Sequence, residues 1–214
     1  ILDTSEPPAV SVRETFDFWV DPQASGENEQ ARQVIDTTGG AYYAKLLEAK
    51  GITYLGSFHN GFRQLTNSKH PVTKPEDLKD LKIRVPGSAV YMGVFNALGA
   101  SPTAMSWSEV FTAIQQKTID GQENGCSVTK SAKMDEIQQY MTIWNYSYEN
   151  DLFVANSRVW ESLDENTRQL LQECATESCE WGRDHLEAEE DQLIQGFMDS
   201  GMQVDILTLS LIHI

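Results

Sequence analysis

The chain has 214 residues, of which 40% are hydrophobic and five are tryptophans, a composition that excludes an intrinsically disordered protein. Its formal net charge of −16 excludes a general nucleic-acid binder, because such a protein needs a basic surface to neutralise phosphates. No apolar run approaches the roughly 20 residues that span a bilayer, so we expect a chain that is not embedded in a membrane.

The first part of the chain predicts one helix followed by one strand. Residues 1–40 are polar and rich in loop-forming residues, and two glycines precede a helical pattern at 41–50. A strand is predicted at 52–55, and residues 59–72 have the pattern of an irregular or edge segment. A capping box formed by Thr73 and Glu76 then predicts a short helix that ends at residue 78.

Residues 81–85 predict a strand with two different faces. Its apolar residues alternate with Lys82 and Arg84, so the two basic side chains share the face opposite the apolar ones. Ser88 is placed to cap a helix that reaches Leu98, where a glycine ends it.

The second half continues the alternation of helices and strands. Ser106 and Glu109 form a second capping box, which opens a helix with an apolar stripe that includes Trp107. Residues 119–124 are too polar and too short for a core strand, and a helix is predicted at 127–135.

A long helix is predicted near the end of the chain. Strand patterns at 140–144 and 152–155 precede it, and another at 202–207 follows it. Residues 164–200 have nearly continuous helical character, which corresponds to roughly 50 Å. Such a helix must cross between two lobes or break at one of its glycines, Gly182 and Gly196. The alternation of strands and helices predicts an α/β protein.

Motifs of known catalytic machinery are missing from the sequence. It contains no nucleophile elbow, phosphate-binding loop, dinucleotide fingerprint or zinc-protease helix. Asp120 and Glu123 are a conceivable acid/base pair, and Cys126 a conceivable nucleophile, but capping of a turn and simple burial are the commoner roles. The three cysteines lack metal-ligand spacing. We therefore expect no catalytic residue, no metal and no cofactor.

Arg84 is the strongest candidate for binding. It lies at the C-terminal end of an expected internal strand, where α/β sheets bind ligands, and a guanidinium matches a carboxylate with two parallel hydrogen bonds. Spacing alone favours a surface arginine equally well. Trp107 is suited to wall a pocket or to join the core, and Asn124 to reach a ligand oxygen or to form a turn.

Residues 61–125 together resemble the solute-binding proteins of tripartite ATP-independent periplasmic (TRAP) transporters, the DctP-like family. The family's G-x-R, its LKIRVP-like strand, LGASPT, the S-E-V helix and the D-G-Q-E-N turn occur here in order and at matching spacing. The similarity extends over roughly residues 15–206. Gly125 departs from the usual proline, and Asp80 and Lys117 replace glycines.

The resemblance implies an α/β, two-lobed fold like that of periplasmic binding proteins, with a long bracing helix. It implies that Arg84 forms the principal salt bridge to a ligand carboxylate. It also implies periplasmic binding of a small organic acid and its delivery to the membrane permease subunits of a TRAP transporter. The ligand-binding residues that it assigns are Arg84, Arg63, Trp107, Asn124 and Tyr146.

The resemblance also bears on the extent of the chain. Residues 1–206 are expected to be a partial solute-binding protein in which both lobes are interleaved, an N-terminal βα segment is missing and the first lobe is incomplete. Residues 207–214 are expected to be a tail that is not native. Two alternatives remain open: a sensor or interaction module on the same fold, and an α/β enzyme acting on a carboxylate, for which the sequence offers no convincing base.

Overall fold

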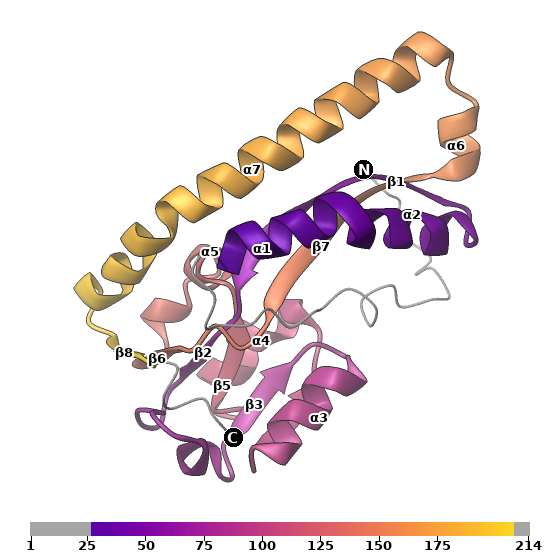
Figure 1. Cartoon of the computed structure of the whole chain (residues 1–214). Helices are drawn as coiled ribbons and strands as arrows, with labels where there is room; N and C mark the ends of the chain where they lie inside the picture. Colours follow the sequence, from indigo (N-terminus) through magenta and orange to yellow (C-terminus); the bar gives the residue numbers. More distant parts are fainter. Residues whose placement is uncertain (1–26, 208–214) are drawn as a thin grey trace.

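The computed structural model describes residues 27–207, so all but the first residue of the expected tail at 207–214, and much of the loop-rich stretch at 1–40, lie outside the described residues. The described part is a mixed α/β structure, which confirms the predicted fold class (Figure 1). Among these residues no helix is long and apolar enough to cross a membrane.

A six-stranded mixed sheet forms one end of the molecule, with the strand order β4-β3-β5-β2-β6-β8 (Figure 1). β3 is parallel to both β4 and β5, β2 is antiparallel to β5 and β6, and β6 is parallel to β8. The strands are β2 (Gln64–Asn67), β3 (Lys82–Val85), β4 (Ser101–Ala104), β5 (Gly121–Asn124), β6 (Tyr140–Ile143) and β8 (Gln203–Ile206).

The two central strands, β2 and β5, are the segments that the sequence did not predict as core strands. Both are fully buried along their length. Their polar side chains are paired across strands: Gln122 Nε2 donates to Thr66 Oγ1 at 2.8 Å, and Thr66 Oγ1 donates to Gln138 Oε1 at 2.5 Å. Buried polar groups cost little once they are hydrogen-bonded, so the expectation of an edge segment and a polar turn was wrong.

Helices cover both faces of this sheet. α3 (Ala89–Ala97) packs Tyr91 and Phe95 against the face that carries Ile83. α5 (Cys126–Ser131) covers the opposite face, where Cys126 packs beside Met141. Two short 3-10 helices complete this end of the molecule, η3 (Pro75–Leu78) and η4 (Met134–Glu136).

Three helix starts test the predicted caps. Ser88 Oγ accepts a hydrogen bond from the N–H of Val90, so the predicted cap of α3 is confirmed. α4 (Trp107–Gln115) begins where predicted, but Ser106 Oγ bonds Ser108 Oγ instead of capping the helix. The predicted cap of η3 is also wrong, because it is the carboxylate of Asp77 that accepts from the backbone N–H groups of residues 73 and 74.

The predicted helix at 127–135 is divided in two. α5 ends at Ser131, and Lys133 adopts the left-handed conformation with φ 56° before η4 begins. Non-glycine residues occupy that conformation only as single residues in turns, so a continuous helix is interrupted there.

A two-stranded antiparallel ladder extends away from the sheet (Figure 1). It pairs β1 (Ile52–Phe62) with β7 (Tyr148–Asn156), so both strands are much longer than the four residues predicted for each. Three helical segments lie beside it: α1 (Glu27–Val34), the π-helix η2 (Ile35–Gly39) and α2 (Gly40–Glu48).

The helical structure before residue 40 corrects the expected loops. Ala31 and Ile35, four residues apart on one helical face, are buried against Phe62 and Tyr148 of the ladder. Tertiary burial of this face overrides the weak helical pattern of the polar residues around it.

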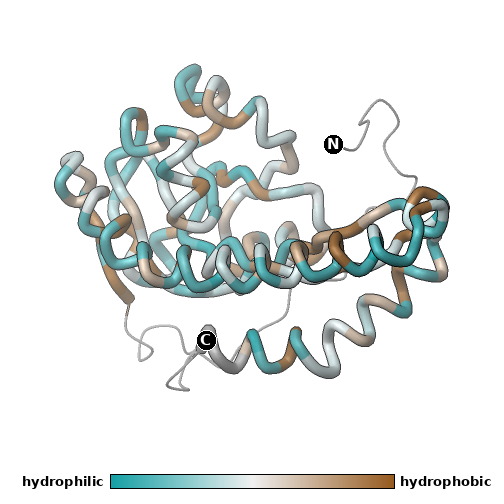
Figure 2. The backbone as a smooth tube through the Cα atoms, turned by 90° about the horizontal axis from the view of Figure 1, so that it is seen from above, coloured by the Kyte–Doolittle hydropathy of each residue, from teal (hydrophilic) through white to brown (hydrophobic). Residues whose placement is uncertain are grey.

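A single 35-residue helix, α7 (Glu165–Asp199), runs along the ladder to the six-stranded sheet, following the short helix α6 (Ser157–Glu161) (Figure 1). It does not break at Gly182 or Gly196. Of the two alternatives, the structure therefore agrees with a continuous helix that crosses from one end of the molecule to the other. Viewed from above, α7 is mostly hydrophilic (Figure 2), in keeping with its few buried residues, Ala175, Cys179, Arg183 and Phe197. The expected long bracing helix is thereby confirmed.

Candidate functional site

One edge of the six-stranded sheet brings together three of the predicted site residues. β3 and β5 run parallel, so their carboxyl ends meet at this edge. Arg84 pairs with Gln122, and Asn124 lies two residues further along the same face of β5. Arg63 directly precedes β2, whose first residue pairs with Asn124. This is the edge at which α/β sheets bind ligands.

Arg84 is held in a fixed orientation at this edge. It is 3% exposed, and its Nε and Nη2 donate to the carbonyl oxygen of Met105 at 3.0 and 2.9 Å. Its guanidinium carbon lies 5.3 Å from the centre of the Trp107 ring, within the range of a cation–π interaction. Two hydrogen bonds to one oxygen and an aromatic contact define the plane of the guanidinium.

Trp107 joins the core, which is one of the two roles that the sequence left open for it. It is the first residue of α4 and packs, partly buried, against a core cluster that includes Val110 and Ile114. The same ring also contacts Arg84. The structure brings these two predicted residues together.

Arg63 is bound by two carboxylates of the chain itself. It is 2% exposed; its Nε and Nη2 reach the two oxygens of Glu123 at 2.5 and 2.8 Å, and its Nη1 reaches Glu149 at 2.5 Å. Burial alone would lower the pKa of this guanidinium, but the paired carboxylates more than reverse the effect, so the pKa lies well above its usual value. Burial alone raises the pKa of Glu123, yet a permanently charged arginine at this distance keeps the two groups as an ion pair.

Tyr146 belongs to the same cluster as Arg63. Its hydroxyl donates to the Glu123 carboxylate, and its own pKa is raised well above the usual value by burial and by that carboxylate, so the phenol keeps its proton. Tyr91 completes the group, with its ring centre 5.1 Å from the Arg63 guanidinium.

The cluster of Arg84 and Trp107 and the cluster around Arg63 lie on opposite faces of the sheet. Arg84 shares a face with its partner Gln122, so the next residue along β5, Glu123, points to the other face with Arg63 and Tyr146. Sequence reasoning missed Glu149 altogether and treated Glu123 as part of a turn. The sequence shows only a glutamate within the polar segment that becomes β5. It gives no sign that this glutamate pairs with Arg63, which lies 60 positions away.

Asn124 has the structural role that the sequence had kept open for it. It is 7% exposed, and its Oδ1 accepts a hydrogen bond from the N–H of Gly125 at 3.0 Å. A Cβ at position 125 would overlap the backbone oxygen of Asn60 in β1, so this close approach requires a glycine.

The conceivable catalytic groups have structural surroundings. Asp120 Oδ2 accepts from the N–H of Lys82 at 3.0 Å, and its other oxygen lies 3.3 Å from Lys69 Nζ. Burial raises the pKa of the Cys126 thiol to about 12, so it is protonated and a poor nucleophile at neutral pH. Within residues 27–207, no three metal-binding side chains are grouped to hold an ion. The arrangement is suited to binding an anion.

Comparison with known proteins identifies a family. The model of the bacterial extracellular solute-binding protein family 7 matches residues 16–210. The 2,3-diketo-L-gulonate-binding periplasmic protein of Escherichia coli K12 is 33% identical over 178 residues, which cover 83% of this chain and 54% of that protein. The C4-dicarboxylate-binding periplasmic protein of Rhodobacter capsulatus is 33% identical over 188 residues, covering 88% of this chain and 55% of that protein.

Solved structures show the same fold. The TRAP periplasmic solute-binding protein of Polaromonas sp. JS666, bound to D-erythronate, superposes with a TM-score of 0.81 at 34% identity over 85% of this chain and 60% of that one. The sugar-acid-binding protein of Advenella mimigardefordensis, in complex with galactonate, gives a TM-score of 0.85 at 29% identity over 91% and 61%. The chain spans about half the length of the curated relatives that it matches.

Proposed function

The chain belongs to family 7 of the bacterial extracellular solute-binding proteins, whose structural neighbours serve TRAP transporters, and from this premise we propose that it binds a small organic acid in the periplasm. We further propose that the bound acid is delivered to the membrane permease subunits of a TRAP transporter. The proposal concerns the whole protein, because the chain covers 54% and 55% of these two relatives.

The observation that carries this proposal is the fixed guanidinium of Arg84. It lies at the carboxyl ends of β3 and β5, where α/β sheets in general bind ligands. Hydrogen bonds to Met105 set the plane of the guanidinium, and the Trp107 ring covers its face. When surrounding protein excludes water, an arginine–carboxylate pair strengthens because the local dielectric falls. A neutral analogue cannot form this charge-assisted pair and should bind more weakly.

The ligands of the relatives point to the same chemical class. D-erythronate and galactonate are bound by two of the neighbours, and a C4-dicarboxylate-binding protein is among the relatives. These acids differ in length and in hydroxyl groups but share a carboxylate. We infer that the carboxylate is what Arg84 recognises.

Arg63, Asn124 and Tyr146 remain proposed ligand-binding residues with weaker roles. The charge of Arg63 is offset by Glu123 and Glu149, which weakens its pull on a ligand carboxylate. Asn124 and Tyr146 each bond a neighbouring protein group as well. We therefore expect Arg63→Lys to reduce affinity less than Arg84→Lys does.

The test is calorimetric titration with galactonate, D-erythronate and succinate, and with the neutral polyol galactitol. Arg84→Ala should weaken binding of the acids by at least about 100-fold, because a charge-assisted pair worth several kcal/mol is lost. Arg84→Lys should recover part of this, since it keeps the charge without the planar fork. Lys82→Ala, an exposed basic residue on the same strand, is the matched control and should bind normally.

Two outcomes would contradict the proposal. One is an Arg84→Ala variant with unchanged affinity, and the other is binding of galactitol as tight as that of galactonate. Recovery of the acid unaltered after long incubation separates a binding protein from an enzyme, since an enzyme would convert it to product.

A further inference from the structure

A second buried polar cluster lies where the ladder meets α7. His59 of β1 and Asn150 of β7 are direct cross-strand partners, 1% and 7% exposed. Residues paired in an antiparallel ladder point to the same face, so their side chains stand side by side. Neither residue takes part in the carboxylate site proposed above.

Neither side chain has a hydrogen bond of ordinary geometry to the described protein, although the backbone of Arg183 lies close enough to the His59 ring to offset slightly the lowering of its pKa by burial. The two ring nitrogens of His59 and both amide atoms of Asn150 lack a partner among residues 27–207. The nearest acidic oxygen to His59 Nε2 is that of Glu187, at 4.0 Å, which is too long for a direct bond. Four such atoms in one place are unusual, because buried polar atoms nearly always bond protein or an ordered water.

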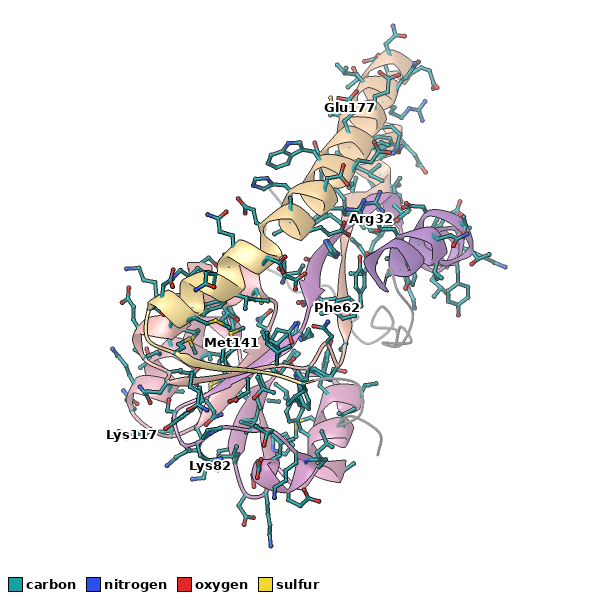
Figure 3. The ribbon with its side chains drawn as sticks, turned by 60° about the vertical axis from the view of Figure 1, so that its left-hand side comes forward. Arg32, Phe62, Lys82, Lys117, Met141 and Glu177 are labelled. Atoms are coloured by element: carbon teal, nitrogen blue, oxygen red, sulfur yellow. The ribbon has the colours of Figure 1, made fainter. Side chains whose placement is uncertain are left out.

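The walls of this cluster carry charges of both signs. Arg183 of α7 pairs with Asp36 of η2 at 2.7 Å, and its buried Nε lacks a partner in the described part of the chain. Arg32 of α1 reaches Asp184 at 2.7 Å and Glu187 at 3.0 Å. Figure 3 shows Arg32 between the first helices and α7, with Phe62 of the ladder nearby. The hydroxyl of Tyr148 is neutral, because burial raises its pKa.

The mixture of donors and acceptors selects the occupant. An anion at this position would face Glu187, and a cation would face Arg183 and Arg32. Water both donates and accepts and is small enough for a buried site, so it matches a neutral imidazole and an amide together. We propose that the junction of the ladder with α7 is a buried water site, in which ordered water bridges His59 and Asn150 to α7.

The protonation state of His59 agrees with this assignment. Burial, and the nearby Arg32, lower the pKa of His59 to about 4, so at neutral pH the ring offers one donor and one acceptor. The consequence for the fold is that α7 meets this stretch of the ladder through water, while ion pairs join α7 to α1 and η2. Its other end is held differently, by apolar packing of Phe197 against Met141.

The test uses the whole 214-residue chain labelled with ¹⁵N. Water-detected Overhauser spectra should show long-lived water at the Asn150 side-chain amide and at the carbon-bound ring protons of His59. In the double variant His59→Phe/Asn150→Leu, contacts from long-lived water to the backbone amides of residues 59 and 150 should also be lost, whereas His185→Phe, on an exposed face of α7, should keep all of these signals.

Further outcomes keep the test decisive. Should the double variant fail to fold, Asn150→Leu alone must lose the amide signal and shift the ¹⁵N resonance of one His59 ring nitrogen. The proposal is overturned if no long-lived water is seen at either side chain. It is equally overturned if the His59 ring shows hydrogen-bond couplings directly to a protein group.

Discussion

The six-stranded sheet and the two-stranded ladder differ in how many of their buried polar side chains are hydrogen-bonded to other protein groups. In the sheet, Gln122 Nε2 donates to Thr66 and Arg63 is enclosed by two carboxylates, although Gln122 Oε1 and Asn67 Nδ2 lack partners among the described residues. In the ladder, His59 and Asn150 are buried without direct partners in the described residues. At the sheet end, protein groups supply most of the hydrogen bonds to the buried polar side chains. At the ladder end, His59 and Asn150 depend on bound water in our proposal.

Apolar residues follow the same contrast. The sheet encloses Phe95 and Leu65 completely, whereas the ladder leaves Phe58 and Phe153 36% and 41% exposed. These two phenylalanines line an open groove of about 1120 Å³ between the ladder and α7, together with Trp181. Each inner strand of the sheet is hydrogen-bonded on both sides, while the described ladder is only two strands wide. A two-stranded ladder is marginal by itself and depends on what packs against it.

The largest expected effect tests the satisfied polar core of the sheet. Glu123→Ala should lower the free energy of unfolding by about 3–5 kcal/mol, because it leaves the buried Arg63 with one carboxylate in place of two. Urea unfolding at pH 7 measures it. Glu136→Ala, which removes an exposed pair with Lys133, is the control and should cost less than about 1 kcal/mol. Equal losses in the two variants would contradict the contrast.

A matched pair of phenylalanines compares the apolar cores directly. Phe95→Ala should destabilise by about 3–5 kcal/mol, since the ring is fully buried and meets Trp144 and Tyr146 edge-on. Phe153→Ala should cost less than about 1 kcal/mol, because much of its ring already faces solvent. Thermal unfolding of both variants gives the comparison. A large loss at Phe153 would show that the groove is covered by further residues.

Acid should weaken the ladder through His59. The unfolded ring takes up a proton near pH 6.5 but the folded one only near pH 4, so the unfolded state binds more protons between these values. The contribution of His59 to the free energy of unfolding is therefore complete above pH 6.5. It falls by about 3 kcal/mol in total as the pH decreases to 4. Urea titrations from pH 7 to 4 should show a shallower slope for His59→Gln than for the unmodified chain. Identical slopes would rule the effect out.

The smallest expected effect concerns the brace. Gly182 has helical geometry and open space around it, so Gly182→Ala should raise the free energy of unfolding by about 0.5–1 kcal/mol. Glu180→Ala, an exposed non-glycine position two residues away, is the control for helix propensity alone. A destabilised Gly182→Ala would mean that the helix bends or breaks at this residue.

Local sequence signals accounted for the elements that depend on near neighbours. The alternation of LKIRV predicted β3 and the face on which Arg84 lies, and Ser88 predicted the start of α3. Continuous helical character predicted α7, although the sequence left open whether it would break. The ordered motifs identified the family, and with it the fold class.

Tertiary structure alone decided how the polar segments are buried. β2 and β5 are mostly polar, and several of their polar groups are hydrogen-bonded to segments that are distant in the sequence. The acidic partners of Arg63 are also distant in the sequence. They place this arginine, which is expected to bind the ligand, at the centre of an ion-pair network. Periodicity and caps are encoded within a few residues and can be read from the sequence. Hydrogen bonds and ion pairs that satisfy a buried group depend on which strands become neighbours, and only the folded chain determines that.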